Sequence, residues 1–170
     1  LARFIFANPR QKWNTKKDMA QEKSKMDFVF EKMTLAHVEA VYQIEEEAFF
    51  TPWSRQSIRS EIENPLGTYL VALDGEKVAA YGGFWTVAPE GNINNVAVHA
   101  DYRGRGLSKL LMDRLIDEAG KKGVKELYLE VRTGNIVAQN LYRSLGFKMV
   151  NVRKGYYADT GYYAKKAEDF

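Results

Sequence analysis

Two arginines and two glycines stand where an apolar run gives way to a helix-like run. The stretch VAVHADYRGRGLSKLL, residues 96–111, contains them as Arg103, Gly104, Arg105 and Gly106. Glycine permits backbone conformations and close approaches that a Cβ forbids. The first turn of a helix leaves N–H groups without partners and carries partial positive charge. Such a place suits an anion such as a phosphate. The alternative is a tight left-handed turn with solvated arginines, and this stretch alone favours neither.

A second group of candidates lies in YLEVRTGNIVAQNLYRSLGF, residues 128–147. In a strand, Glu130 would share the polar face, opposite an apolar face. Because helices should cover both faces of a central strand, a carboxylate there needs a partner or a wet cavity. Glu130 is therefore either a general base at a cleft or an exposed or ion-paired residue. Tyr142 is either functional or a half-buried core tyrosine, and Asn135 can be a plain N-cap.

The elements that would position these residues follow from hydrophobic periodicity and from capping residues. Strands are expected over residues 26–33, 68–73, 77–85, 92–99, 124–132 and 147–157, and helices over 35–48, 55–64, 108–122 and 135–145. The three middle strands have hairpin-sized links and should be antiparallel, whereas the later strands, joined by helices, should include a parallel pair. The fold class is therefore α/β, a mixed sheet covered by helices.

Composition limits the class of protein. A chain of 170 residues with 45% apolar and 28% charged residues suits one soluble domain. No apolar run approaches the roughly 20 residues that span a bilayer. The chain contains no cysteine, which excludes disulfides, thiolate metal sites and a cysteine nucleophile, and agrees with a cytoplasmic location. His37 and His99 do not have metal-ligand spacing, so we predict no metal.

The first 25 residues are basic. They carry seven lysines and arginines against two acidic residues, a net charge of +5, whereas the other 145 residues carry −2. Such an arm can touch RNA, but it is more often a solvated tail. It lacks the apolar region of a signal peptide, and Met26 is a plausible natural start. We expect a flexible extension over residues 1–25, one domain over 26–160 and an atypical tail over 161–170.

On these motifs the chain resembles the GCN5-related N-acetyltransferase (GNAT) family, from about Phe28 to Tyr157. The matching motifs are Arg103-x-x-Gly106-x-Ser108 after a strand, and Arg132-x-x-Asn135-x-x-Ala138-x-x-Leu141-Tyr142-x-x-x-Gly146-Phe147. FFTPWS (49–54) and RKGYY (153–157) look like the subgroup that acetylates ribosomal proteins with an N-terminal alanine. The resemblance implies a GNAT fold, in which a mixed, mostly antiparallel sheet of about six or seven strands is flanked by four helices. Acetyl-CoA would bind between the central strands.

The resemblance also implies a role for each matching residue. Backbone groups of residues 96–98 would pair with the pantetheine arm like an added strand, and the pyrophosphate would lie on the amides that open the helix after Gly106. The residues implied to bind acetyl-CoA are Val96, Ala97, Val98, Arg103, Gly104, Arg105, Gly106, Leu107, Ser108, Lys109 and Asn135. Glu130 matches the proton acceptor of the family and Tyr142 its proton donor. Phe50, Pro52, Trp53, Tyr156 and Tyr157 would shape the peptide pocket.

Two positions depart from the family pattern. Ser108 stands where the family has glycine or alanine, and we expect only a modest change in cofactor affinity. The chain after Gly161 reads YYAKKAEDF, whereas the family usually ends with an acidic pair and an apolar strand. The sequence therefore does not predict whether the last strand forms, nor whether it builds the outer wall of the peptide pocket.

The expected function is acetyl transfer from acetyl-CoA to the N-terminal α-amine of a protein, with a small-subunit ribosomal protein that begins with alanine as acceptor. Glu130, if buried, would take the proton of the ammonium directly or through a water, and Tyr142 would protonate the leaving thiolate. Because there is no cysteine, direct attack in a ternary complex is favoured. Two alternatives remain: a lysine side chain or small-molecule amine as acceptor, or a non-catalytic acetyl-CoA-binding or ribosome-associated module. We expect no membrane partner, and contact with RNA only through the basic arm.

Overall fold

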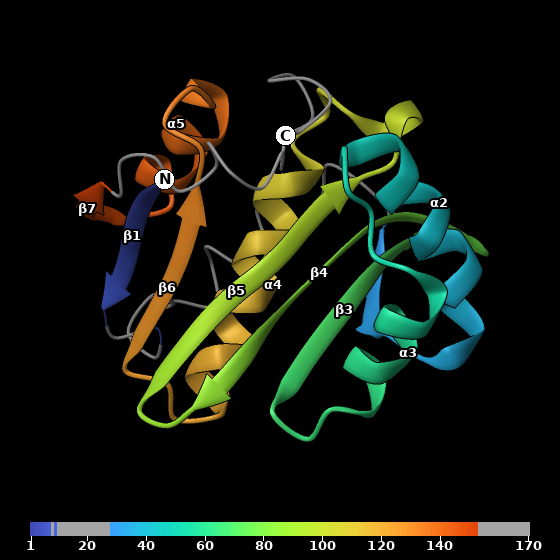
Figure 1. Cartoon of the computed structure of the whole chain (residues 1–170), viewed down its shortest axis with the longest axis horizontal. Helices are drawn as coiled ribbons and strands as arrows, with labels where there is room; N and C mark the ends of the chain where they lie inside the picture. Colours follow the sequence, from blue (N-terminus) through green and yellow to red (C-terminus); the bar gives the residue numbers. More distant parts are fainter. Residues whose placement is uncertain (8, 10–27, 153–170) are drawn as a thin grey trace.

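A single sheet organises the molecule. The computed structural model describes residues 1–7, 9 and 28–152, and within them seven strands follow one another in the order β2-β3-β4-β5-β6-β1-β7 (Figure 1). The strands are β1 (Ala2–Ala7), β2 (Val29–Lys32), β3 (Gly67–Asp74), β4 (Lys77–Val87), β5 (Glu90–Val98), β6 (Glu126–Val131) and β7 (Lys148–Val152). Neighbouring strands are antiparallel except β5 and β6, which are parallel. The predicted mixed, mostly antiparallel sheet is confirmed.

Helices cover the two faces of the sheet in pairs. In the described part of the chain they are α2 (Val38–Ala48), α3 (Arg55–Glu63), α4 (Leu107–Lys121) and α5 (Ile136–Ser144), as four helices were predicted. Ala97 of β5 packs in the core beneath α2 and α3, whereas its neighbours Val96 and Val98 pack in the core with α4 and α5. This alternation is that of a strand buried on both faces. No helix in the described ranges is long and apolar enough to cross a membrane.

The first predicted helix starts later than its periodicity indicates. Residues 35–37 form a 3-10 turn, and α2 begins at Val38. Leu35 is 48% exposed, because the tighter turn rotates it away from the row of Val41 and Ile44.

The parallel pairing of β5 with β6 is short. Register partners run from Glu90–Glu126 to Ile93–Leu129, and no pair follows in the described residues although both strands continue. On its other side β5 stays paired with β4 up to Val98. The second half of β5 therefore turns one backbone edge toward a gap at the centre of the sheet.

The N-terminal residues contradict the prediction of a solvated arm. Ala2–Ala7 form β1, which lies between β6 and β7 and is antiparallel to both (Figure 1). Ala2, Phe4 and Phe6 are buried and alternate with more exposed residues. This period of two marks a half-buried strand, and the basic charge of the segment concealed it. The other charged residues of the extension, Arg10 to Lys25, lie outside the described residues.

One face of β6 is less covered than expected. Leu127, Leu129 and Val131 are buried, but Glu130 on the opposite face is exposed. On that face α2 and α3 contact β3, β4 and β5, and in the described part of the chain no helix packs over β6. Within residues 28–152, the helices that we expected over both faces of this strand lie over one face only.

Burial of β1 can be tested through Phe6. Its ring is 8% exposed and lies 5.3 Å from that of Phe147, measured between centroids. Phe6→Ala should lower the free energy of unfolding by about 3 kcal/mol, because it empties a core site. Denaturant unfolding measures this. The exposed control Ala7→Ser on the same strand should change it by less than about 0.5 kcal/mol. Equal, small effects of both changes on the free energy of unfolding would contradict the burial of β1 in the sheet.

Candidate active site

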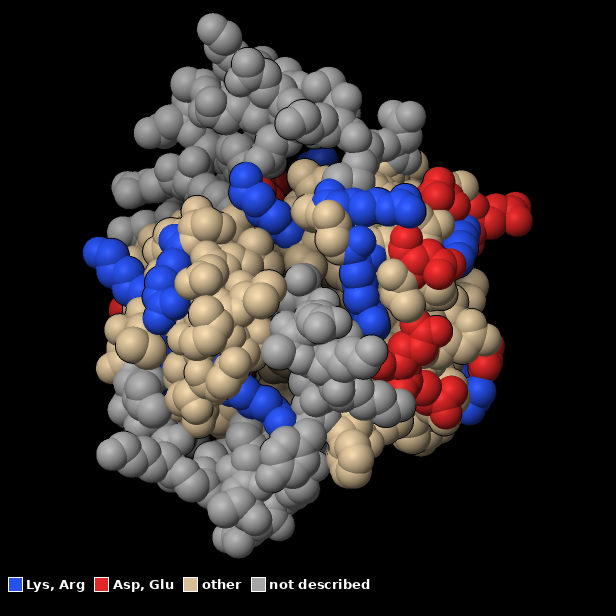
Figure 2. Space-filling view, turned by 90° about the horizontal axis from the view of Figure 1, so that it is seen from above, with Lys and Arg blue, Asp and Glu red and all other residues tan. Residues whose placement is uncertain are grey.

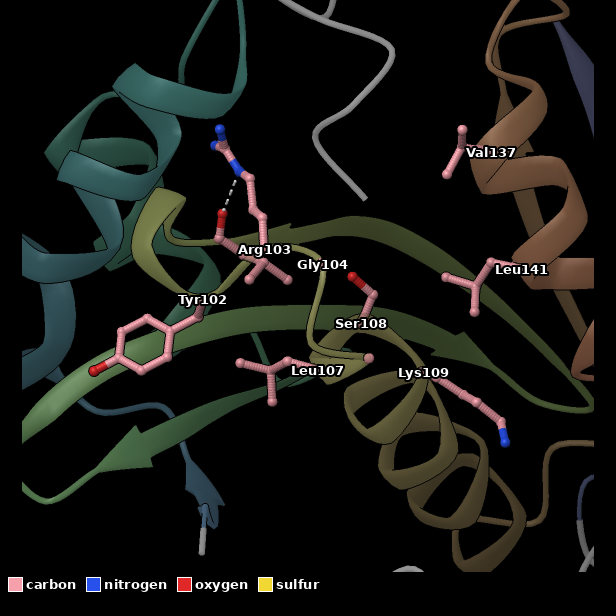
Figure 3. Close-up of a pocket in the computed structure, with 10 residues that line it drawn as sticks. Tyr102, Arg103, Gly104, Leu107, Ser108, Lys109, Val137 and Leu141 are labelled. Carbon is pink, nitrogen blue, oxygen red and sulfur yellow. Dashed lines mark hydrogen bonds between the residues drawn. The ribbon is translucent and has the colours of Figure 1, made fainter. Parts of the chain in front are cut away.

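A pocket opens between the end of β5, the start of α4, and α5. Figure 3 shows the residues around this pocket, whose volume is about 210 Å³. It is lined by Val98, Tyr102, Arg103, Gly104, Gly106, Leu107, Ser108, Lys109, Val137 and Leu141. Seven of these residues belong to the predicted cofactor set, so the structure brings most of that set together. Val96 and Ala97 precede Val98 on β5 and are buried, whereas Arg105 is exposed.

The turn into α4 answers the question that its glycines raise. Gly104 has φ +73° and Gly106 has φ +78°, the left-handed region, and a Cβ at either would meet nothing within 4 Å. The backbone conformation, rather than lack of space, therefore favours glycine. The first hydrogen bond of the helix runs from the Leu110 amide to the Gly106 carbonyl. Because a helical amide bonds to the carbonyl four residues earlier, the amides of the first three residues of α4, 107–109, have no acceptor within the helix. The tight turn and the amides suited to an anion occur together.

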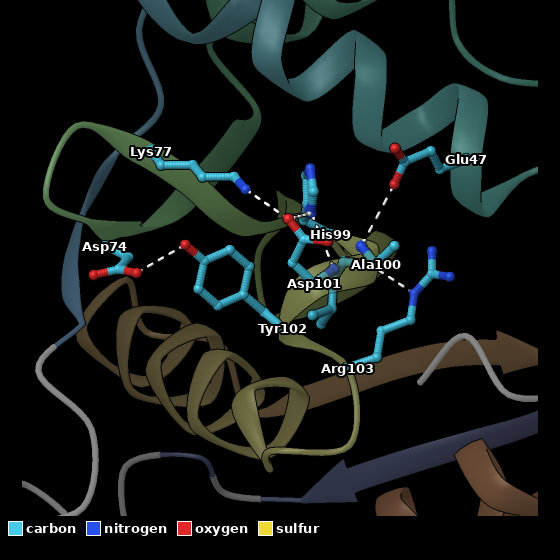
Figure 4. A network of polar contacts seen from close by, with 9 residues as sticks. Glu47, Asp74, Lys77, His99, Ala100, Asp101, Tyr102 and Arg103 are labelled. Atoms are coloured by element: carbon cyan, nitrogen blue, oxygen red, sulfur yellow. Dashed lines mark hydrogen bonds and ion pairs between the residues drawn. The ribbon is translucent and has the colours of Figure 1, made fainter.

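A polar network holds the turn just before this loop (Figure 4). The Tyr102 hydroxyl donates to Asp74 at 2.8 Å, and the Lys77 ammonium lies 2.8 Å from the Asp101 carboxylate. The Arg103 Nε donates to the Val98 carbonyl at 3.1 Å. These contacts tie the loop to β3, β4 and β5, so the amides at the start of α4 have a fixed direction.

Positive charge surrounds the opening. Viewed onto the end of the sheet at which α4 begins, lysines and arginines stand around the middle of the surface, and acidic side chains gather on the side of α2 (Figure 2). The loop supplies Arg103, Arg105 and Lys109, and the partial positive charge of the helix start adds to theirs. Among the described residues no group of three or more His, Asp or Glu could hold a metal, and the absence of a metal stays a prediction.

A buried carboxylate anchors the loop between α2 and α3. Glu45 of α2 is fully buried and accepts hydrogen bonds from the Trp53 amide at 2.7 Å, the Asn95 side chain at 2.8 Å and the Tyr81 hydroxyl. Burial raises the pKa of Glu45, and it raises the pKa of Tyr81 well above its ordinary value. Asn95 lies on β5 just beyond the point where β6 leaves it. Glu45 thus connects residues 50–53, the loop predicted to shape the peptide pocket and called the peptide loop below, to the centre of the sheet.

The predicted peptide-binding residues are only partly described. Phe50 is 61% exposed, and Pro52 is half-buried. The ring of Trp53 lies 6.1 Å from that of Tyr69, measured between centroids. Tyr156 and Tyr157 lie outside the described residues. The structure therefore shows a loop with an exposed aromatic side chain, but not the pocket that the five residues would form together.

The two candidate catalytic residues lie on opposite faces of the sheet, and neither lines the described pocket. Tyr142 is 5% exposed and packs in the core with α4 and α5, whereas Glu130 is exposed on the other face. Burial raises the pKa of Tyr142. Asn135 is buried, and its side chain accepts the Ala138 amide at 3.0 Å, so it caps α5 as the simpler interpretation predicts.

Sequence reasoning missed several residues of the site. Val137 and Leu141 are four residues apart on α5, a spacing that places both on one helix face and that could have indicated a lining role. Tyr102 gave no such signal. Glu45 and Asn95 are 50 residues apart, and only the tertiary structure brings them together.

The buried Glu45 should make stability depend on pH. Because its pKa is raised above the ordinary 4.5, the folded state binds more protons than the unfolded state between these two values, and stability falls as the pH rises through this range. Glu45→Gln removes this dependence. The unfolding free energy of the variant should therefore rise relative to the wild type from about pH 4.5 upward, as measured by denaturant unfolding.

Glu46→Gln, an exposed change on the same helix, controls for the general loss of one negative charge. A difference between wild type and Glu45→Gln that stays constant from about pH 4 to 8 would show that burial does not disfavour the charge.

Comparisons with known proteins agree with this geometry. The model of the acetyltransferase (GNAT) family matches residues 38–147. The ribosomal protein bS18 alanine N-acetyltransferase of Escherichia coli K12 is 39% identical over 121 residues, which are 71% of this chain and 81% of that protein. A protein of the same name from Salmonella typhimurium is 40% identical over 119 residues, 69% of this chain and 79% of that one.

A solved structure agrees as well. The crystal structure of the ribosomal-protein-S18-alanine N-acetyltransferase from Escherichia coli has a TM-score of 0.72 and 34% identity, and covers 79% of this chain and 86% of that one. With the family model matched over more than half of its length, this chain belongs to the GNAT family of acetyltransferases.

Proposed function

We propose that this chain transfers an acetyl group from acetyl-CoA to the N-terminal α-amine of a protein, with the N-terminal alanine of a ribosomal protein as acceptor. One observation carries the proposal: over most of both chains the sequence is similar to enzymes named for acetylation of alanine on ribosomal protein bS18. A cytoplasmic location is consistent with a ribosomal protein as the acceptor.

The residues at the start of α4 fit the diphosphate of acetyl-CoA. They offer amides at residues 107–109, two left-handed glycines open to space, and the charges of Arg103 and Lys109. A solved GNAT-fold protein from Thermoplasma acidophilum, 17% identical with a TM-score of 0.70, was crystallised with coenzyme A. In this chain the backbone edge of Val96–Val98 would hold the pantetheine arm, because β6 leaves that edge after Ile93.

The gap between β5 and β6 explains how two residues on opposite faces can serve one reaction. A thioester held in the gap can be approached by Glu130 from the face that carries the peptide loop and by Tyr142 from the face that carries α5. Ser108 is 7% exposed and projects toward the pocket (Figure 3), so its hydroxyl can add a hydrogen bond where a glycine or alanine could not.

The chemistry follows from these side chains. An α-ammonium has a pKa of about 8, so most of the acceptor must lose a proton before it can attack. Glu130 accepts that proton, directly or through a water, from an exposed position rather than from the buried one that we expected. Acetyl-CoA supplies the activated acetyl group. Tyr142 keeps its proton at neutral pH because the pKa of a tyrosine is about 10 and burial raises that of Tyr142 further. It donates a hydrogen bond or the proton to the leaving sulfur.

Glu130→Gln and Tyr142→Phe test these roles. Each should lower kcat for a peptide with a free N-terminal alanine by about 10²-fold or more, with the KM for acetyl-CoA little changed, because each removes a proton transfer but no binding contact. Steady-state kinetics measure both values. Glu126→Gln, on the same strand and face as Glu130, is the matched control and should keep kcat within about twofold.

The same assay separates the other functions. Full kcat in both variants would refute the assigned roles. Acetylation of a peptide whose N-terminus is blocked, at a lysine side chain, would identify a different acceptor. Binding of acetyl-CoA without turnover by any amine would leave only a binding module.

Gly106→Ala tests the cofactor loop. Alanine disfavours φ +78°, so the turn should shift and the KM for acetyl-CoA should rise about tenfold or more. Gly123→Ala introduces the same strain at φ +83° just after the far end of α4, and should leave that KM unchanged. Equal effects at the two glycines would argue against a cofactor role for the α4 loop.

A further inference from the structure

Strand β1 joins the first residues of the chain to both elements that carry the candidate catalytic side chains. It lies beside β6 in antiparallel register, with Phe4 opposite Leu129 and Arg3 opposite Glu130. Successive residues of a strand point to opposite faces. Phe4 therefore faces the core with α5, and Arg3 shares the exposed face of Glu130.

On the core face, Phe4 is in contact with Tyr142. Phe4 is fully buried, and its ring centroid lies 6.1 Å from that of Tyr142 with the ring planes tilted by 59°. Phe147 lies 6.0 Å from Tyr142 on the same measure. Among the described residues the Tyr142 hydroxyl has no hydrogen-bond partner, and burial alone shifts its pKa. The direction of that hydroxyl is therefore determined by the rings against which Tyr142 packs.

On the exposed face, β1 is fixed next to Glu130. The Arg3 guanidinium stacks 4.2 Å from the ring centroid of Tyr128, which is two residues before Glu130 on the same face. The Tyr128 hydroxyl in turn donates to Glu126 at 2.8 Å. The backbone ladder to β6 and the stacking of Arg3 on Tyr128 keep β1 in the register that presses Phe4 against Tyr142.

We propose that β1 is a positioning element of the transfer site, and that Phe4 is a positioning residue which orients Tyr142. The inference rests on the proposed function, since it takes Tyr142 as the group that meets the leaving sulfur. It assigns a catalytic contribution to a segment that precedes residues 38–147, the range of the family match. Aromatic rings prefer edge-to-face and tilted contacts, so an aliphatic side chain of similar size fills the space but does not impose the same orientation.

A double-mutant cycle tests this in the full chain. Phe4→Leu should lower kcat about tenfold and leave the KM for acetyl-CoA within about twofold, because a small displacement of a proton donor slows the reaction without loss of binding. In the Tyr142→Phe background the same change should lower kcat by less than about twofold, because the hydroxyl that Phe4 orients is already gone. Steady-state kinetics of the four proteins give the comparison.

Phe84→Leu is the matched control. Phe84 is also fully buried in the same core, but it lies on β4, and β5 and β6 separate it from β1. The Phe84→Leu variant should have a lower melting temperature, as the Phe4→Leu variant does, but its kcat should stay within about twofold of the wild type. Phe4→Met replaces Phe4→Leu if the latter does not fold.

Three results would overturn the inference. The first is an equal loss of kcat in Phe4→Leu and Phe84→Leu, which would show a general effect of core damage. The second is a tenfold effect of Phe4→Leu that persists in the Tyr142→Phe background; this removes the role of β1 but leaves the proposed function standing. The third is full kcat in Tyr142→Phe alone, which removes the donor role on which both proposals rest.

Discussion

The short parallel pairing of β5 with β6 is the constraint on which the site depends. The two strands share a ladder only from Glu90–Glu126 to Ile93–Leu129, and then β5 follows β4 while β6 follows β1. A backbone edge that a continuous sheet would satisfy is left beside a gap. The loop and the start of α4 close one end of that gap, and α5 closes its side. The open edge follows from this divergence, and the amides at residues 107–109 and the two faces that carry Glu130 and Tyr142 lie around the same gap.

Polar groups hold the flanks of the gap where apolar packing cannot. Glu45 accepts three hydrogen bonds, which compensate for its burial and connect the α2–α3 loop to β5. On the other side, the Asp74–Tyr102 hydrogen bond and the Lys77–Asp101 ion pair hold the turn before α4. Each network joins residues from different elements, so the peptide loop and the cofactor loop are fixed relative to the same strand. A group-transfer site needs this relation, because two substrates must meet in one geometry.

Strand β1 brings the start of the chain beside strands from its second half. Its ladder joins residues 2–7 to residues 126–131 and 148–152, so the start of the chain pairs with segments more than 100 residues later. The strand covers the edge of β6 and contributes Phe4 and Phe6 to the core that also contains Tyr142. The first residues of a basic segment that composition describes as a tail are thus part of the sheet that supports the candidate chemistry.

The sequence by itself determined the features that depend on neighbours along the chain. The glycine turn before α4, the capping of α5 by Asn135, the four helices and six of the strands all follow from local spacing, because caps, turns and periodicity act over a few residues. Only the tertiary structure decided that β1 enters the sheet, that β5 and β6 separate after Ile93, that Glu130 is exposed and that Glu45 meets Asn95. These outcomes depend on which distant surfaces bury each other, and this is a competition among contacts that no local window of residues contains.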